Sequence, residues 1–155
     1  MKKEKVQFQH YTDFVGELKA TYRRTSVPST TIRESKDVID FIRPYFDECM
    51  DNHEEMMIVH VNNANQVVNV HRHTIGGTTG VLYDAKLIFQ QALLIRTEGL
   101  FIVHNHPSGK LKASNADVDM SIKLSKGAKI LGFHLIDSLI ITRESYLSLK
   151  DESMF

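Results

Sequence analysis

The stretch Phe101–Asp117 reads FIVHNHPSGKLKASNAD and contains the residues that decide both the fold and the chemistry of this chain. Within it, His104, His106, Ser114 and Asp117 form the pattern H-x-H-x₇-S-x₂-D. Imidazole nitrogen and carboxylate oxygen are zinc ligands, and three protein ligands leave a fourth coordination position for water. The pattern therefore favours a catalytic metal site over a structural one.

The secondary structure expected for this stretch would bring those residues together. Phe101–Val103 is a short apolar run, typical of a buried strand. If the strand continues to His106, the two histidines point to the same side, because side chains two apart share a face. Pro107–Gly109 then predicts a turn. Ser114 opens a helical pattern that places Asp117 in the first helical turn.

Each part of the pattern also has an explanation that needs no metal. Ser114 and Asp117 form a near-standard capping box, with Asp in place of Glu, which is expected at many helix starts. A histidine pair in a strand is more often structural or exposed than a set of ligands. The conjunction changes the balance, because all four residue types at this spacing would arise by chance with a probability on the order of 10⁻³.

A second carboxylate is expected near such a metal. Hydrolytic zinc works with a carboxylate that takes a proton from water and returns it to the leaving group. Glu54 and Glu55 precede Met56–Val61, an apolar run that predicts another strand. Only one of two adjacent strand residues can face the metal, and composition does not say which.

Length and composition predict a single compact domain. The chain has 155 residues, of which 42% are hydrophobic and 25% charged, as in ordinary globular domains. Its 19 basic and 19 acidic residues balance, so no net charge attracts nucleic acid or anionic lipid. Cys49 is the only cysteine, which excludes an internal disulfide and favours a cytoplasmic location. No apolar stretch is long enough to cross a membrane, and the start MKKEKVQFQHY lacks the apolar core of a signal peptide.

Hydrophobic patterning predicts a mixed α/β (α+β) fold with a central sheet flanked by helices. The alternation over Phe14–Arg23 predicts a half-buried strand, and Ser26–Thr31 predicts a linker. Ser35 is expected to cap a helix that Pro44 kinks or splits. A hairpin of Met56–Val61 and Val67–Val70 is expected next, then a flexible loop at Gly76, Gly77 and Gly80 and a helix over Asp84–Leu94. The strand that contains His104 should follow, and after it a helix over Ser114–Leu131, a strand over Phe133–Ile141 and a short edge strand over Tyr146–Leu149.

The segment His104–Gly109, followed by Ser114 and Asp117, resembles the JAMM (MPN+) metalloprotease motif in the form carried by the RadC family. The resemblance spans roughly Phe14 to Leu149 and includes these further segments: Tyr22-Arg23, Glu54, Asn63-Ala64-Asn65, Ile88–Leu93 and Leu135–Ile141. It implies the JAMM fold, which is similar to that of cytidine deaminases, together with a zinc ion and a peptide or isopeptide substrate.

Laid on this sequence, the resemblance implies a role for each residue of the site. His104, His106 and Asp117 would hold zinc, and Glu54, the first of the two glutamates, would be the general base. Ser114 would donate a hydrogen bond to the carbonyl oxygen as it gains negative charge.

Two positions depart from the RadC pattern without touching the ligand set. Ser138 stands where relatives commonly have His, and Lys112 where relatives often have Pro. Deaminase chemistry is excluded, because it needs an H-x-E and a P-C-x-x-C ligand set that a chain with one cysteine does not have.

The resemblance also suggests how the chain is divided. Residues 1–34 are expected to form an N-terminal extension with one strand, and residues 35–155 the RadC-type JAMM/MPN domain. Full-length relatives often carry an additional N-terminal helical module linked to DNA-binding domains, and we expect no such module here.

Other histidines and the lysines have simpler interpretations. His71 and His73 form a second H-x-H, predicted to be an exposed pair or a rim that contacts substrate, because no matching acidic or cysteine ligand follows. His60 is predicted to be a hydrogen-bonded core residue, and Cys49 a packed one. A basic neighbourhood, predicted to be a solvated face with nucleic-acid contact as the alternative, contains Lys110, Lys112, Lys123, Lys126 and Lys129.

Two functions of different classes follow. The first is a zinc-dependent hydrolase of peptide or isopeptide bonds. The second is a non-catalytic module associated with DNA repair or recombination, in which zinc supports the fold. The sequence does not identify the substrate or the oligomeric state.

Overall fold

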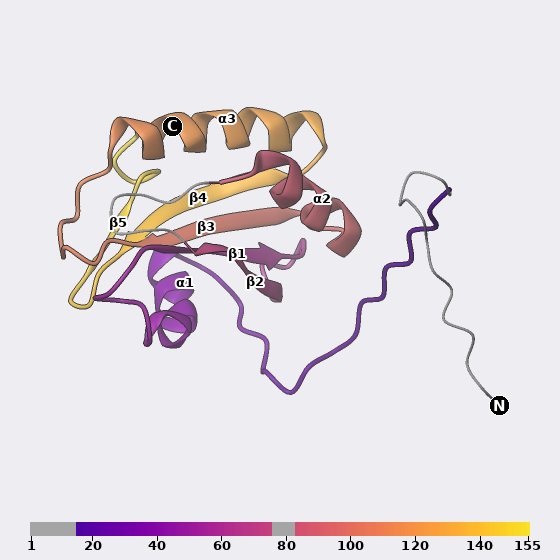
Figure 1. The fold of residues 1–155 in the computed structure, drawn as a ribbon, viewed down its shortest axis with the longest axis horizontal. Helices are drawn as coiled ribbons and strands as arrows, with labels where there is room; N and C mark the ends of the chain where they lie inside the picture. The colour runs from indigo at the N-terminus through magenta and orange to yellow at the C-terminus, as the bar shows by residue number, and fades with distance from the viewer. Residues whose placement is uncertain (1–14, 76–82) are drawn as a thin grey trace, which may run out of the picture.

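The fold is a three-layer arrangement built on one mixed sheet, as shown by a computed structural model that describes residues 15–75 and 83–155. The sheet has five strands in the order β2-β1-β3-β4-β5. Helix α1 covers one face, and helices α2 and α3 cover the other (Figure 1). The predicted mixed sheet flanked by helices is confirmed.

The first half of the sheet is antiparallel. Strands β1 (Glu55–Val61) and β2 (Val67–Ile75) form the predicted hairpin, with β2 five residues longer than expected from the pattern. Strand β3 (Gly99–Asn105) pairs antiparallel with β1, so that Met56 lies opposite His104. The start of β1 therefore lies beside the end of β3.

The second half of the sheet contains its one parallel pair. Strand β3 leads through helix α3 (Asn115–Ile130) to β4 (His134–Ile141), which runs parallel to β3, and the short β5 (Tyr146–Ser148) completes the sheet. In such a crossover, the end of the first strand and the start of the helix meet at the same edge of the sheet. This edge is where the segment Phe101–Asp117 changes from strand to helix.

Each face of the sheet has its own apolar core. One core packs residues of α1 and of the following 3₁₀ turn against alternate strand residues, and includes Val38, Ile42, Phe46, Met57 and Val103. The other packs α2 (Ala85–Ile95) and α3 against the opposite face, and includes Met56, Ile58, Ile88, Ile102 and Leu124. The alternation of Met56 with Met57 between the two cores is the period of a strand buried on both sides.

The helix predicted after Ser35 forms, but its start differs from the prediction. Helix α1 (Ser35–Ile42) has Glu34 as its N-cap residue, not Ser35, and gives way to a 3₁₀ turn, Arg43–Phe46, at Pro44. The Ser35 hydroxyl instead donates to Asp137 Oδ2 at 2.8 Å. Ser35 was a wrong cap prediction because a buried carboxylate on β4 competes for its hydroxyl.

The strand predicted over Phe14–Arg23 is wrong in the part that the structure describes. Residues 15–25 are extended but exposed, and none of them forms a strand. Val15 and Leu18, which alternation placed in a strand, are 101% and 74% exposed. Alternation predicts a face, but a strand also needs a partner edge. Among described residues 15–34, the one bridge is an isolated pair of Thr31 with Gln66, the residue before β2.

The structure bears only in part on the expected loop, membrane crossing and division of the chain. The glycine-marked loop at Gly76, Gly77 and Gly80 lies outside the described residues. No described helix is both long and apolar enough for a membrane crossing. The division of the chain at residues 34 and 35 stays a prediction.

Candidate metal centre

Two imidazoles meet at the carboxyl end of β3. His104 lies in the strand with its side chain 1% exposed, and His106 follows the strand end with its side chain 14% exposed. Their Nε2 atoms are 3.1 Å apart. The other ring nitrogen of His104, Nδ1, is buried and has no hydrogen-bond partner in the part of the chain that the structure describes. The polar contacts of this ring are therefore concentrated at Nε2.

Asp117 comes to the same point from the first turn of α3. Its Oδ1 lies 3.2 Å from His104 Nε2, and its Oδ2 lies 3.9 Å from His106 Nε2. In residues 15–75 and 83–155, this is the one group of three such side chains whose ligand atoms all lie within 4.8 Å of one another. The group could hold a metal ion.

The donor atoms lie close enough to share one cation. The two Nε2 atoms are 3.1 Å apart, and each lies within 3.9 Å of one oxygen of Asp117, Oδ1 for His104 and Oδ2 for His106. One ligand atom can be chosen from each residue so that all three lie within 4.8 Å of one another. Two imidazole nitrogens and one carboxylate oxygen are also a donor set that zinc accepts.

The turn after β3 orients the ring of His106. Its Nδ1 lies 2.9 Å from the carbonyl oxygen of Lys110, so Nδ1–H donates and Nε2 keeps its lone pair for the cluster. The chain can fold back this tightly because Gly109 adopts a φ of 75°, in the left-handed region that favours glycine. The turn therefore fixes the tautomer that a metal ligand needs.

The carboxylate of Asp117 has a second role as part of the helix cap. Oδ2 accepts hydrogen bonds from the backbone N–H and the hydroxyl of Ser114, both at 2.7 Å, and Ser114 Oγ accepts from Asp117 N at 3.2 Å. Burial opposes ionisation of Asp117, but the bonds from His104 and Ser114 outweigh it and hold the pKa of the carboxyl well below its usual range. Asp117 thus belongs both to the capping box and to the candidate ligand group, and its carboxyl is charged at neutral pH.

The register of β1 decides which glutamate shares the face of the cluster. Met56 lies opposite His104, and facing residues of an antiparallel pair project to the same side. Glu54, two residues before Met56, lies on that side, whereas Glu55 projects to the α1 face. There, the Glu55 carboxylate lies 2.6 Å from Arg72 Nε and 2.8 Å from His53 Nε2. Continued alternation before β1 thus favours Glu54 over Glu55 as the glutamate on the side of the candidate metal ligands.

The comparison with known families agrees with this geometry. Residues 32–154 match the model of the RadC-like JAB domain. The chain belongs to the RadC-like JAB domain family. Domains of this family are related to JAMM peptidases, so the resemblance that begins at His104 is confirmed at the level of the family.

Curated relatives of this RadC-like domain carry the name UPF0758 protein, which states no activity. The protein of Flavobacterium johnsoniae is 36% identical over 80% of this chain and 53% of its own length. Those of Methanosarcina mazei and Aquifex aeolicus are 31% and 29% identical over 81% and 80% of this chain, and over 54% and 52% of their own lengths. The chain thus spans about half the length of these relatives.

The second H-x-H of the RadC-like domain does not form a comparable cluster. His71 Nδ1 lies 3.2 Å from His60 Nε2, while His73 Nε2 accepts the backbone N–H of Asp84. His60 is fully buried and its Nδ1 lies 2.7 Å from the Thr97 hydroxyl, as predicted for a core histidine. His60 and His71 thus share a hydrogen-bonded chain with Thr97, whereas His73, beside the start of β1, bonds to the residue before α2.

Cys49 and the lysines have the surroundings that were expected. Cys49 is buried, and burial with the nearby Glu55 carboxylate raises the pKa of its thiol to about 11, which makes it unreactive at neutral pH. The basic neighbourhood is solvent-exposed throughout and comprises Lys110, Lys112, Lys123, Lys126 and Lys129.

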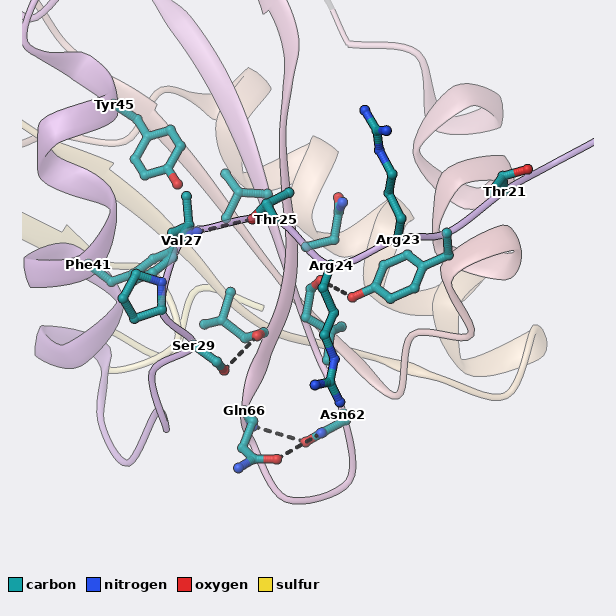
Figure 2. A pocket seen from close by; sticks show the side chains of 16 residues that line it. Thr21, Arg23, Arg24, Thr25, Val27, Ser29, Phe41, Tyr45, Asn62 and Gln66 are labelled. Atoms are coloured by element: carbon teal, nitrogen blue, oxygen red, sulfur yellow. Dashed lines mark hydrogen bonds between the residues drawn. The ribbon is translucent and has the colours of Figure 1, made fainter.

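A pocket of about 630 Å³ lies away from the metal ligands, between the N-terminal segment and the β1–β2 turn (Figure 2). Its lining includes Arg23, Tyr45, Asn62 and Gln66. The turn is at the opposite end of β1 from Glu54, about 20 Å along a strand of this length. The pocket is therefore separate from the cluster, and the chemistry of the donor set, not cavity size, identifies the candidate site.

Two contributors to the site were missed by sequence reasoning. The carbonyl of Lys110 acts through the backbone, so no side-chain pattern could indicate it. Asn105 did leave a signal, because a carboxamide is uncommon inside an apolar strand and must find partners when buried.

Proposed function

We propose that this RadC-like domain is a zinc-dependent hydrolase of peptide or isopeptide bonds. The convergence of His104, His106 and Asp117 beside the glutamate-bearing start of β1 is the observation that carries the proposal. Three ligands on two elements leave one side of the cluster to solvent, where His106 and Asp117 are 14% and 17% exposed. A substrate carbonyl can approach from that side.

The roles of the residues follow from their chemistry. His104, His106 and Asp117 would hold zinc, which when bound supplies a Lewis acid that polarises the carbonyl and lowers the pKa of a water. Glu54 takes a proton from the water whose oxygen attacks the carbonyl carbon. As the carbon–nitrogen bond breaks, Glu54 returns the proton to the leaving amine nitrogen.

Ser114 has a conditional role in this proposal. Its only hydroxyl proton is donated to Asp117 Oδ2 in this structure, and its oxygen accepts the Asp117 N–H. Stabilising the charge on a carbonyl oxygen would require the hydroxyl to turn away from Asp117. Binding of a cation by the carboxylate would weaken that competing hydrogen bond and so favour the turn.

Metal content and a matched glutamate pair test the proposal. Purified protein is expected to contain about one zinc per chain, lost in His104→Ala, because tetrahedral sites need every ligand. Against any peptide found in a library cleavage screen, Glu54→Gln should keep the zinc and lose about 10²–10⁴-fold in kcat. Glu55→Gln, on the other face, should keep kcat. Equal activity of Glu54→Gln and wild type would reject the mechanism.

A DNA-associated module is the second candidate, and the exposed lysines around α3 are the observation that favours it. Affinity for single-stranded or branched DNA that falls steeply with salt and survives Glu54→Gln would support this function. Absence of such binding would remove it.

A further inference from the structure

Asn105 stands between the two histidines of the cluster but faces away from them. It is the last residue of β3 and is completely buried. Because side chains alternate along a strand, its carboxamide projects to the α1 face while His104 and His106 project to the other. It therefore cannot be a ligand, and its burial requires partners on the α1 side.

Those partners are all backbone groups of the segment that leads into β1. Asn105 Oδ1 accepts the N–H of Glu55 at 2.7 Å, and Nδ2 donates to the carbonyl of His53 at 2.9 Å. Nδ2 also lies 3.2 Å from the carbonyls of Cys49 and Met50. The carboxamide thus holds peptide groups on both sides of Glu54.

This arrangement controls the direction of the Glu54 side chain. The carbonyl of residue 53 and the N–H of residue 55 point to the same side of an extended chain, so a two-point hydrogen bond to both fixes the peptide orientation around residue 54. A rotation or slip by one residue would exchange the faces of Glu54 and Glu55. The Asn105 clamp, defined by the bonds to His53 and Glu55, opposes that exchange.

We propose that Asn105 is a positioning residue: its clamp on His53 and Glu55 holds Glu54 on the face of the metal ligands. The inference rests on the proposed function, because it assigns a role toward the residue proposed as general base. Asn105 would then link the two parts of the proposed site, because the residue between His104 and His106 would also fix the position of the Glu54 carboxylate.

Two Asn105 variants and a control test the clamp. Asn105→Leu removes all four contacts at similar volume, and Asn105→Asp, the safer variant for folding, keeps the acceptor but loses the Nδ2 donors. Asp137→Asn is the control, because it alters a buried polar residue on the same face of the sheet, away from the segment before β1. Each protein is loaded with Co²⁺, and NMR measures the pseudocontact shifts of the Glu54 and Glu55 methylene groups.

In wild type, the Glu54 shift should exceed the Glu55 shift, and both Asn105 variants should lose that difference while binding one cobalt ion. Amide exchange at Glu55 should accelerate at least about tenfold in Asn105→Leu, as expected when a buried hydrogen bond is lost. With a cleavable peptide and zinc, kcat should fall at least about tenfold, while KM should stay within about twofold. This is the loss expected when a general base is displaced but substrate binding is intact. Asp137→Asn should match wild type in the cobalt shifts and in kcat; its amide exchange is left out of the comparison because the variant loses acceptors of its own.

The outcomes separate this inference from the proposed function. If both Asn105 variants fold and keep the Glu54 shift, or keep kcat while Glu54→Gln loses it, the positioning role is overturned and the hydrolase stands. If wild type binds neither zinc nor cobalt, or Glu54→Gln is fully active, the hydrolase itself falls and the positioning role falls with it. If wild type binds metal but cleaves no peptide, the cobalt shifts alone decide the positioning role.

Discussion

At the scale of single residues, the ring of His106 depends on a glycine that contacts no metal. Gly109 allows the turn that brings the Lys110 carbonyl to His106 Nδ1. Its positive φ would cost about 1–2 kcal/mol for a residue with a Cβ. Strain at residue 109 can relax only by moving the turn, and with it the carbonyl that orients the ligand.

Gly109→Ala is therefore expected to weaken zinc affinity about tenfold, as the loss of an orienting hydrogen bond does at other sites. Gly132→Ala is the matched control, because Gly132 has a similar φ of 85° at the far end of α3. The control should lose comparable stability and keep wild-type affinity in a competition titration with a zinc chelator. Equal affinity of the two variants would show that the Lys110 carbonyl does not orient His106.

The buried histidine pair makes a second residue-scale prediction, on pH. Burial and the neighbouring His71 lower the pKa of His60 to about 3, and burial and His73 lower that of His71 to about 4, from an ordinary 6.5. The folded protein thus keeps both rings neutral while the unfolded chain binds protons below pH 6.5. The free energy of unfolding should then decrease by up to about 1.4 kcal/mol per pH unit for each ring between about pH 6 and pH 4.

Urea denaturation at several pH values measures this slope. His60→Gln should reduce the pH dependence of the free energy of unfolding by about the contribution of one imidazole. His134→Gln, at an exposed position, should leave that dependence unchanged. A slope in His60→Gln identical to that of wild type would mean that His60 is protonated in the folded state.

The residue scale also shows how far the sequence could predict the site. The spacing of His104, His106 and Asp117 sufficed to propose the cluster, because strand and helix periodicities translate spacing into direction. Residue spacing left Glu54 and Glu55 open, and the resemblance favoured Glu54; the register of β1 against β3 adds support that alternation alone does not contain. Hydrogen bonds to backbone groups, such as those of Asn105, depend on segments that only the fold brings together.

At the scale of elements, Asp137 joins three of them. Its carboxylate accepts the hydroxyls of Ser35 on α1 and Ser148 on β5, and the backbone N–H of Ser138 and Lys150. It is 1% exposed, and these four hydrogen bonds compensate the cost of removing its polar oxygens from water. Asp137 explains why α1 starts at Ser35 and why so short an edge strand as β5 stays paired.

Asp137→Ala should consequently destabilise the fold by about 2–4 kcal/mol, since it leaves one buried hydroxyl, one half-buried hydroxyl and two N–H groups without this acceptor. Asp40→Ala, which removes only an exposed ion pair with Lys36, should cost less than about 0.5 kcal/mol. Chemical denaturation compares the two. A loss in Asp137→Ala no larger than in the control would contradict the role assigned to Asp137.

The elements also differ in how well periodicity predicted them. The β1–β2 hairpin and helix α3 were predictable because each has a buried face and local turn or cap residues that mark its ends. The Phe14–Arg23 segment has the alternation of a strand, but a ladder partner is a tertiary property. In the described part of that segment, the one side-chain hydrogen bond to the sheet runs from the Tyr22 hydroxyl to the Val68 carbonyl.

At the scale of the whole molecule, the candidate metal ligands lie on both sides of the parallel crossover from strand β3 to helix α3. A cation bound only in the folded state stabilises it by about 2.7 kcal/mol when its concentration is 100 times the dissociation constant. The ligands belong to β3, the turn and α3, so metal binding should act on global unfolding.

Chelation is thus expected to lower Tm by about 5–10 °C in a chain of this size. Readdition of zinc should restore Tm, and His104→Ala should show no response to either treatment. Differential scanning calorimetry measures the shift. A wild-type Tm that is insensitive to the chelator would show that zinc does not stabilise this fold.

Asp117 both caps helix α3 and belongs to the candidate ligand group, which restricts the substitutions that this position can accept. Glutamate is the usual residue at its position of a capping box, and replacing Asp117 with Glu would keep the helix start intact. The added methylene would, however, displace the oxygen that now lies 3.2 Å from His104. A descendant with that single change should keep its helix start but disturb the geometry of the three candidate ligands, so a better cap at this position would come at the expense of the proposed metal site.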